Sequence, residues 1–182
     1  MWKTAWFMRS STRQTRDLIV FAMFAAMMCG SQIAMRNLPG IHPLGLLMAT
    51  LTLVYRWRAL IPIYVYILVY GAIHGFSMWW LPYIYLWLPL WGMFMIAGNL
   101  RLPKTAQTPI FMILCGLHGL SWGAMYAPAE ALFWGFTFEQ TIAWIIAGLP
   151  FDAVHAASNF GMGIMIVPLA QVTKRLAATS GN

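Results

Sequence analysis

Three polar side chains fall close together in GLPFDAVHAASNF, residues 148–160, within an otherwise apolar part of the chain. Asp152, His155 and Asn159 are offset by three and seven residues, so they would share one face of a helix. An ionisable side chain at bilayer depth costs at least about 2.5–3.5 kcal/mol, so such groups usually face a cavity or each other. The spacing favours a polar cavity wall over hydrogen bonding between helices. For Asp152 alone, a helix N-cap is an equally good interpretation, because Gly148 and Pro150 predict a helix start there.

Aromatic and histidine side chains recur at four-residue intervals in three other apolar segments. This interval keeps each set on one helix face, so we expect the sets to converge on a pocket near one membrane surface. The alternative is the aromatic belt of a membrane interface, which fits Trp79, Trp80 and Tyr85 better. For Trp87 and Trp122, core packing and pocket lining stay equally open. The three sets are Tyr66, Tyr70 and His74; Tyr83, Trp87 and Trp91; and His118, Trp122 and Tyr126.

The composition predicts an all-α membrane protein. Of 182 residues, 61% are hydrophobic and 8% are charged, which is more apolar surface than a soluble domain of this size can bury. Six helices of about 20 residues would occupy about 120 positions. We therefore expect residues 1–182 to form a single integral membrane domain with short loops. The predicted spans are 18–35, 43–56, 59–76, 82–98, 109–127 and 150–172, and the short span 43–56 leaves open whether it crosses fully.

Two segments outside the predicted spans are long enough to consider separately. Residues 1–17 form a basic tail. Residues 127–147, which include an extra apolar stretch at 131–147, form an external loop before the last helix. Its aromatic side chains are numerous enough to cover a pocket as a lid, and a solvated loop with a few interfacial aromatic residues is the alternative.

The basic residues predict the orientation. Ten of the eleven Lys and Arg residues fall on one side of the predicted spans, and only Arg36 falls on the other. Cytoplasmic loops collect basic residues, so both termini are expected in the cytoplasm, and the formal charge of +7 reflects topology and lipid headgroups rather than nucleic acid. Counted at 1.5 Å per residue from Lys174, Asp152 lies about 33 Å away, in the external half. The ten are Lys3, Arg9, Arg13, Arg16, Arg56, Arg58, Arg101, Lys104, Lys174 and Arg175.

A six-span chain with Ala22 and Ala26 in FAMFAAMM and a last helix that opens GLPFDAVHAASNF resembles the substrate-binding S components of energy-coupling factor (ECF) transporters. The resemblance covers most of the chain, and its specific part is the last helix. It implies a prokaryotic plasma membrane protein, whose Ala22 and Ala26 pack against a T component that works with two ABC ATPases. It also implies an outward-facing pocket. The substrate-binding residues would be Arg36, Asn37, Trp87, His118, Trp122, Asp152, His155 and Asn159.

The residues of this chain indicate a small ring-bearing substrate. Stacking on Trp or Tyr contributes roughly 0.5–1.5 kcal/mol beyond area burial. Asp152, Glu130 and Glu139 outnumber Arg36 on the external face, which favours a neutral or partly cationic micronutrient such as a B vitamin or its precursor. Arg36 could equally hold a carboxylate or phosphate. The chain has no G-x-x-x-x-G-K-[ST] pattern, so the energy for transport must come from partner ATPases.

Other functions remain as alternatives. An integral membrane enzyme could use Asp152 to orient His155 as a base, with Ser121, Ser158 or a metal completing the site. However, no H-E-x-x-H or nucleophile-elbow pattern is present, so we expect no catalytic residues. A metal-ion S component is disfavoured because the start, MWKTAWFM, lacks the histidine near the N-terminus that those proteins have, so we expect no metal site and no cofactor. A stand-alone carrier is the third alternative.

Overall fold

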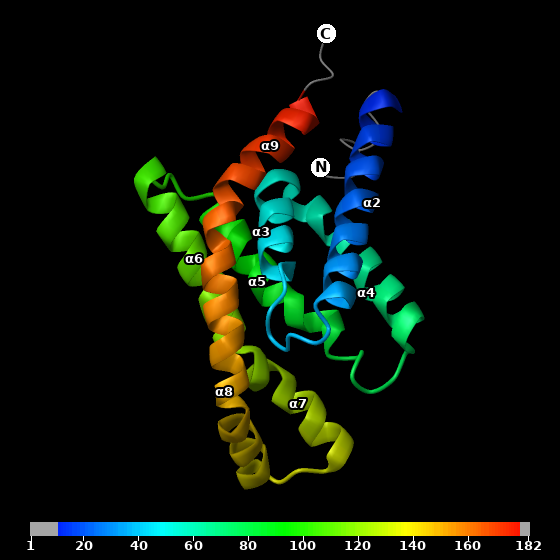
Figure 1. The fold of residues 1–182 in the computed structure, drawn as a ribbon, viewed down its shortest axis with the longest axis vertical. Coiled ribbons are helices and arrows are strands. Elements are labelled where there is room, and N and C mark those ends of the chain that lie inside the picture. The colour runs from blue at the N-terminus through cyan, green and yellow to red at the C-terminus, as the bar shows by residue number, and fades with distance from the viewer. Residues whose placement is uncertain (1–10, 179–182) are drawn as a thin grey trace, which may run out of the picture.

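The structure is a computed structural model that describes residues 11–178, with side chains from residue 14 onward. This part of the chain is a bundle of helices and contains no strand (Figure 1). Lys3, Arg9 and the side chain of Arg13 lie outside the described residues. The helices are α2 (Ser11–Ala34), α3 (Leu44–Tyr55), η1 (Arg56–Ala59), α4 (Leu60–His74), α5 (Tyr83–Ala97), α6 (Lys104–Leu120), α7 (Trp122–Trp134), α8 (Phe138–Met162), η2 (Gly163–Met165) and α9 (Ile166–Ala178).

Four helical runs are long and apolar enough to cross a membrane. They are Gln14–Ala34, Leu44–His74, Lys104–Trp134 and Phe138–Ala178, and α5 is a shorter apolar helix. The all-helical fold and its suitability for a membrane therefore agree with the sequence analysis. Six crossings and the cytoplasmic location of the termini stay predictions.

The last helix begins earlier than the sequence analysis expects. Residue 150 is not a helix start, because α8 begins at Phe138 and Pro150 lies inside it. A capping box fixes the true start: Thr137 N–H donates to Gln140 Oε1 at 2.8 Å, and Gln140 N–H donates to Thr137 Oγ1 at 3.3 Å. At the other end, η2 joins α8 to α9 without a loop.

Residues 127–147 are helical rather than an open loop. Ala127–Trp134 completes α7, and α7 ends at Gly135, whose left-handed φ of 65° is accessible to glycine at low cost. Residues 138–147 already belong to α8. The segment is thus a helical hairpin at the bottom of Figure 1, and several of its apolar side chains are exposed, including Leu132 at 81% and Phe138 at 77%.

Glycines bring α6 and α8 into close contact. A Cβ at Gly119 would lie 2.7 Å from His155 O, and a Cβ at Gly163 would lie 2.7 Å from the Cα of Met112. Residues without side chains let two helix backbones approach, which is a common way of packing helices in membranes. The predicted span 109–127 is interrupted at Ser121, where α6 gives way to α7.

The central helix is α3, which contacts α2, α5, α8 and α9. Most of its side chains are buried, including Leu44, Met48 and Leu51. A helix that is apolar all round packs inside a protein or a membrane, so the short length of the predicted span 43–56 fits its place in the core.

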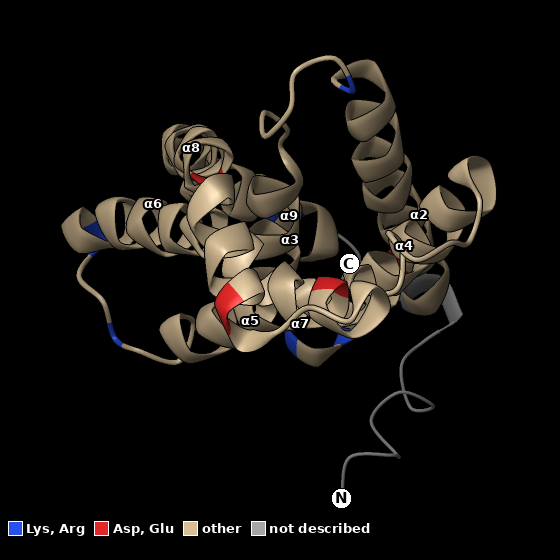
Figure 2. Cartoon of the chain, turned by 90° about the horizontal axis from the view of Figure 1, so that it is seen from below, with Lys and Arg blue, Asp and Glu red and all other residues tan. Residues whose placement is uncertain are grey.

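The basic residues of several helices meet at one end of the bundle. Arg58 forms an ion pair with Asp17 of α2, with Nη1 2.6 Å from Oδ2, and Arg16 donates to the carbonyl of Ala177 in α9 at 2.5 Å. The start of α2 and the ends of α3 and α9 therefore lie together, at the top of Figure 1. Charged residues are few elsewhere on the helices (Figure 2). Arg36 follows the opposite end of α2.

Candidate functional site

A cluster of aromatic and imidazole rings lies at the end of the bundle opposite the basic residues. Trp87 of α5 contacts His118 of α6, with ring centroids 5.6 Å apart, and Trp122 at 5.0 Å. Trp122, the first residue of α7, also lies 5.2 Å from the ring of His155 in α8. His155 in turn meets His42 with a centroid distance of 4.8 Å. The structure thus brings together four residues predicted from the sequence and one that was not predicted.

The unpredicted residue is His42, which lies between α2 and α3. Its Nε2 is 2.9 Å from Nε2 of His155, and its ring is buried. The loop reaches α8 because Gly40 has a positive φ of 78°, and a Cβ at Gly40 would lie 3.3 Å from His155 N. The sequence signal was the turn RNLPGIH, residues 36–42, in which a histidine follows Pro39 and Gly40 after one intervening residue. Three of the four histidines of the chain therefore meet here, although they come from different segments.

His42 is uncharged at neutral pH. A contact of 2.9 Å between two imidazole nitrogens is a hydrogen bond only when one nitrogen carries a proton and the other accepts it. Burial, with a smaller contribution from His118, lowers the pKa of His42 to about 4. His42 therefore contributes hydrogen-bonding capacity to the cluster, and no charge.

Asp152 caps the start of a neighbouring helix, which the sequence did not predict. Both of its carboxylate oxygens lie 3.1 Å from the N–H of Gly123, in the first turn of α7. The sequence analysis considered a cap on the start of its own helix, but Asp152 lies in the middle of α8 and caps its neighbour. A carboxylate is favourable there, because the N-terminus of a helix carries unpaired N–H groups and a partial positive charge. A Cβ at residue 123 would lie 2.5 Å from Asp152 Oδ2, so the contact depends on glycine.

Several buried polar atoms near the rings have no hydrogen-bond partner within the described chain. Asn159 is buried in α8, and its Oδ1 lies 3.2 Å from the position that a Cβ would take at Gly45 of α3. An unsatisfied buried donor or acceptor costs about 1–3 kcal/mol, so these atoms favour a polar guest. They are Nε1 of Trp87, Nδ1 of His118, Nδ1 of His42, Oδ1 of Asn159 and the hydroxyl of Tyr66.

Tyrosines extend the cluster on one side. Tyr66 lies 6.5 Å from Trp87 between ring centroids, and Tyr83 contacts both Trp87 and Trp122, at 6.2 and 6.0 Å. Members of all three four-residue sets therefore meet in the cluster, whereas His74 is exposed and Trp91 packs against Trp57 at the basic end, with ring centroids 4.5 Å apart. Tyr126 points elsewhere, since its hydroxyl donates to the carbonyl of Trp79 at 2.7 Å.

Arg36 and Asn37 are exposed residues of the loop that carries His42. Their loop contacts α8 through Gly40, whereas the two side chains themselves point to the outside. Glu130 accepts a hydrogen bond from Trp134 on the exposed surface of the α7–α8 hairpin, at 2.8 Å. The charged groups that were expected around the substrate thus lie outside the ring cluster.

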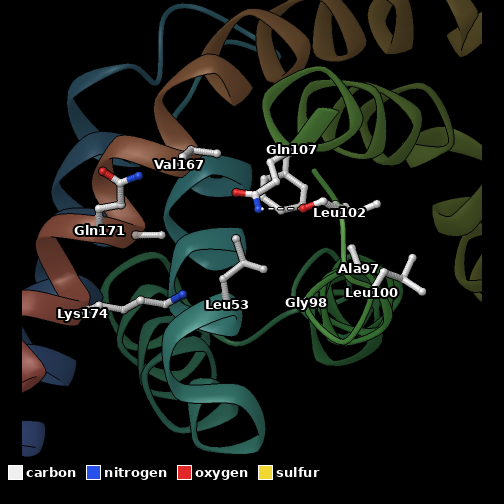
Figure 3. Close-up of a pocket in the computed structure, with 11 residues that line it drawn as sticks. Leu53, Ala97, Gly98, Leu100, Leu102, Gln107, Val167, Gln171 and Lys174 are labelled. Atoms are coloured by element: carbon white, nitrogen blue, oxygen red, sulfur yellow. Dashed lines mark hydrogen bonds between the residues drawn. The ribbon is translucent and has the colours of Figure 1, made fainter. Parts of the chain in front are cut away.

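The ring cluster is closed in this structure. Trp87 is 2% exposed and His118 is 1% exposed, and the rings pack directly on one another. Cavities of about 220–360 Å³ lie elsewhere among the described residues. Figure 3 shows one of them, of about 220 Å³, between α3, α6 and α9, with Gln107, Gln171 and Lys174 in its wall. Access to the cluster therefore requires movement of a covering segment.

The chemistry of the cluster is that of a binding site for a flat polar ring. Indole, phenol and imidazole rings offer stacking faces, and the unpartnered atoms offer both donors and acceptors. Among the described residues, no three His, Cys, Asp or Glu side chains are arranged to hold a metal ion. Comparisons of the chain with protein-family models, with curated proteins and with solved structures found no match.

Proposed function

We propose that this protein is the substrate-binding S component of an ECF-type importer and that it captures a small ring-bearing micronutrient from outside the cell. The observation that carries the proposal is the buried ring cluster, with its unpartnered polar atoms on four different helices and one loop. A core that served only for packing would be better filled by aliphatic side chains, because each unsatisfied buried polar atom costs stability.

The cluster narrows the substrate class. Asp152 is engaged by Gly123 and His42 is neutral. Arg36 and Glu139 are exposed, and the half-buried Glu130 accepts a hydrogen bond from Trp134. A charged ligand would find no counter-ion among these side chains. We therefore favour a neutral ring, such as an uncharged B vitamin or its precursor, over the partly cationic ring that the sequence also allowed.

The covering segments suggest how such a substrate would enter. The loop at residues 35–43 holds His42 over the cluster, and Trp122 starts the α7–α8 hairpin. Outward movement of the loop would separate His42 from His155 and expose the ring of Trp122. Loops that carry binding residues on a rigid scaffold commonly move in this way.

The proposed topology has six crossings, with both termini in the cytoplasm of a prokaryotic cell. Ala22 and Ala26 lie on the exposed face of α2, whereas Ala25 packs inward. A small-residue face that is accessible from the membrane lets a second helix approach closely. This supports docking of α2 against a T component, which two ABC ATPases would drive.

Ligand titration of the purified protein tests the proposal. We expect one ring-bearing compound from a panel of vitamins and precursors to bind, as measured by calorimetry. Trp122→Ala and Asn159→Ala should each weaken its binding by about fivefold, since stacking and one buried hydrogen bond are each worth about 1 kcal/mol. Trp57→Ala, at the basic end, is the matched control and should leave the affinity unchanged. If no compound in the panel binds, the proposal is wrong.

The alternatives have direct tests of their own. A membrane enzyme would need Asp152 beside His155, whereas Asp152 contacts Gly123 and the Nε2 of His155 faces His42. Turnover by the isolated protein that is lost in His155→Ala would nevertheless favour the enzyme. A stand-alone carrier would purify from native membranes without a T component and ATPases.

A further inference from the structure

A second polar site lies at the basic end of the bundle. A cavity of about 300 Å³ opens between the start of α2, the corner between α3 and η1, and the end of α9. It lies at the opposite end from the ring cluster and takes no part in the proposed capture of substrate. Its walls are Arg16, Asp17, Val54, Tyr55, Arg56, Arg58 and Ala177.

The charges in this cavity do not balance. Asp17 pairs with Arg58, which leaves the charges of Arg16 and Arg56. Arg16 donates to a neutral acceptor, the carbonyl of Ala177. Arg56 donates to the carbonyl of Met95 at 2.6 Å and to Asn99 Oδ1 at 2.7 Å. The cavity walls therefore carry a net charge of +2.

The backbone fixes one of these charges in place. Arg56 is the one non-glycine residue with a positive φ, 56°, among those that the structure describes. Such a conformation is strained for a residue with a side chain and persists where surrounding contacts hold it. Here the side chain of Arg56 spans to the end of α5, and Trp91 Nε1 donates to the Arg56 carbonyl at 3.3 Å. The guanidinium is thus fixed in place by its contacts with the end of α5.

The neighbouring residues place the cavity at the level of lipid headgroups. Trp57, between Arg56 and Arg58, is 58% exposed and packs against Trp91, with ring centroids 4.5 Å apart. Exposed tryptophans in membrane proteins concentrate at the boundary between acyl chains and headgroups. Further along α2, the exposed side chains of Leu18 and Ile19 offer an apolar surface directly below the cavity.

We infer that this cavity binds the phosphate group of an anionic phospholipid from the adjacent leaflet, with the acyl chains lying against the exposed Leu18 and Ile19 near the start of α2. Basic pockets between helices on the cytoplasmic side are suited to anionic headgroups. A bidentate guanidinium matches phosphate geometry, and the apolar surface of α2 matches the chains. This combination of fixed positive charge and adjacent apolar surface selects a lipid over a free anion.

Native mass spectrometry of the full chain in nanodiscs tests the inference. Discs would contain dioleoylphosphatidylglycerol mixed with dioleoylphosphatidylcholine, and we expect at least one phosphatidylglycerol to be retained selectively. Arg16→Gln should weaken this binding by about fivefold, the factor expected for one basic side chain near an anionic membrane surface. Arg16 is the better variant because Arg56 also holds the end of α5. Arg101→Gln removes the same charge from a loop outside the cavity wall and should change binding much less.

Three outcomes would overturn the inference. Equal retention of the two lipids would remove the headgroup selectivity. If Arg16→Gln and Arg101→Gln weakened the binding of phosphatidylglycerol equally, the lipid would be attracted by a diffuse positive surface potential and not by a site. Displacement of the lipid by millimolar inorganic phosphate would show that the cavity takes a free anion. None of these measurements uses a transport substrate, so the inference stands or falls independently of the proposed function.

Discussion

At the scale of single residues, polar side chains at the end of the bundle that holds the ring cluster have two separate tasks. Asp152 holds the start of α7, whereas His42, His155 and Asn159 surround the ring cluster. The sequence places Asp152, His155 and Asn159 on one face of one helix. Asp152 and His155 nevertheless differ in role, because Asp152 contacts Gly123 of α7 and His155 contacts His42 of the loop before α3.

We predict that Asp152→Ala lowers the stability of the protein more directly than it lowers ligand affinity. Removing a helix cap costs about 0.5–2 kcal/mol, and the N–H of Gly123 would lose both of its acceptors. Thermal unfolding in detergent measures the effect. Glu139→Gln, in the exposed first turn of α8, is the comparison and should shift the midpoint less. An unchanged midpoint in Asp152→Ala would show that the cap contributes nothing.

We also predict that stability falls as the pH drops from about 6.5 to 4. The folded pKa of His42 is lowered to about 4 from 6.5, so in this window the unfolded chain binds more protons than the folded one. The stability that neutral His42 provides is complete above pH 6.5 and is lost as the pH falls through the window. A shift of this size corresponds to a few kcal/mol, on the order of 3.

Unfolding midpoints measured at several pH values would check this. His42→Gln cannot titrate and should flatten the dependence, whereas His74→Gln, at an exposed histidine, should preserve it. If the unfolding midpoint depended on pH equally in His42→Gln and in the wild type, His42 would not be the group responsible.

At the scale of helices, apolar runs in the sequence were enough to predict that these segments are helical. The boundaries of the last helix were not predictable in the same way. Gly148 and Pro150 look like a helix start, but the capping box at Thr137 and Gln140 begins the helix earlier, and Pro150 lies inside that helix. Local signals compete along a chain, and tertiary contacts decide among them.

Some residues of the ring cluster could be predicted from the sequence because they lie on helices, whereas a residue in a loop could not. Trp87, His118, Trp122 and His155 stand at regular helical spacings, so their faces could be inferred. His42 lies in a loop, where no periodicity says which way a side chain points. Its position depends on the close approach of Gly40 to His155 in α8. These two residues are 115 positions apart in the sequence. The exposure of Arg36 and Asn37 likewise depends on how this loop folds.

We predict that Gly119→Ala destabilises the packing of α6 on α8. The added methyl would lie 2.7–2.9 Å from backbone atoms of His155 and Ala156, which cannot rotate away. Overpacking of this kind costs typically about 1–3 kcal/mol. The loss would appear as a lower unfolding midpoint in detergent.

Gly148→Ala is the matched control for this substitution. Gly148 also lies within α8, but a Cβ there would meet nothing within 4 Å. Alanine has the higher helix propensity, so this variant should be as stable as the wild type or up to about 1 kcal/mol more stable. Equal destabilisation of both variants would indicate a general intolerance of α6 and α8 to substitution.

At the scale of the whole molecule, the bundle has a polar ring cluster at one end and a basic surface at the other. The outward face of α2 connects these two regions along one side. If the protein works as an S component, substitutions on this face should separate binding from transport.

We predict that Ala22→Leu leaves ligand affinity and thermal stability unchanged but reduces uptake by cells at least several-fold. Ala22 is exposed, so a larger side chain meets no part of the bundle, yet it would keep a partner helix at a distance. Uptake of labelled substrate, together with co-purification of the T component, measures the effect. Ala25→Leu, at a buried position of the same helix, should instead lower stability. Normal uptake by Ala22→Leu would argue against docking through this face.

The continuous helical run from Phe138 to Ala178 has a consequence for the surrounding bilayer. Its 41 residues, at 1.5 Å each, give a rod about 60 Å long, roughly twice the thickness of the hydrocarbon layer. An upright rod would lift the apolar tip at Leu132 and Phe138 far into water. The molecule must therefore lean strongly in the bilayer, or draw the lipid upward around its tip, and each arrangement deforms the membrane where the protein sits.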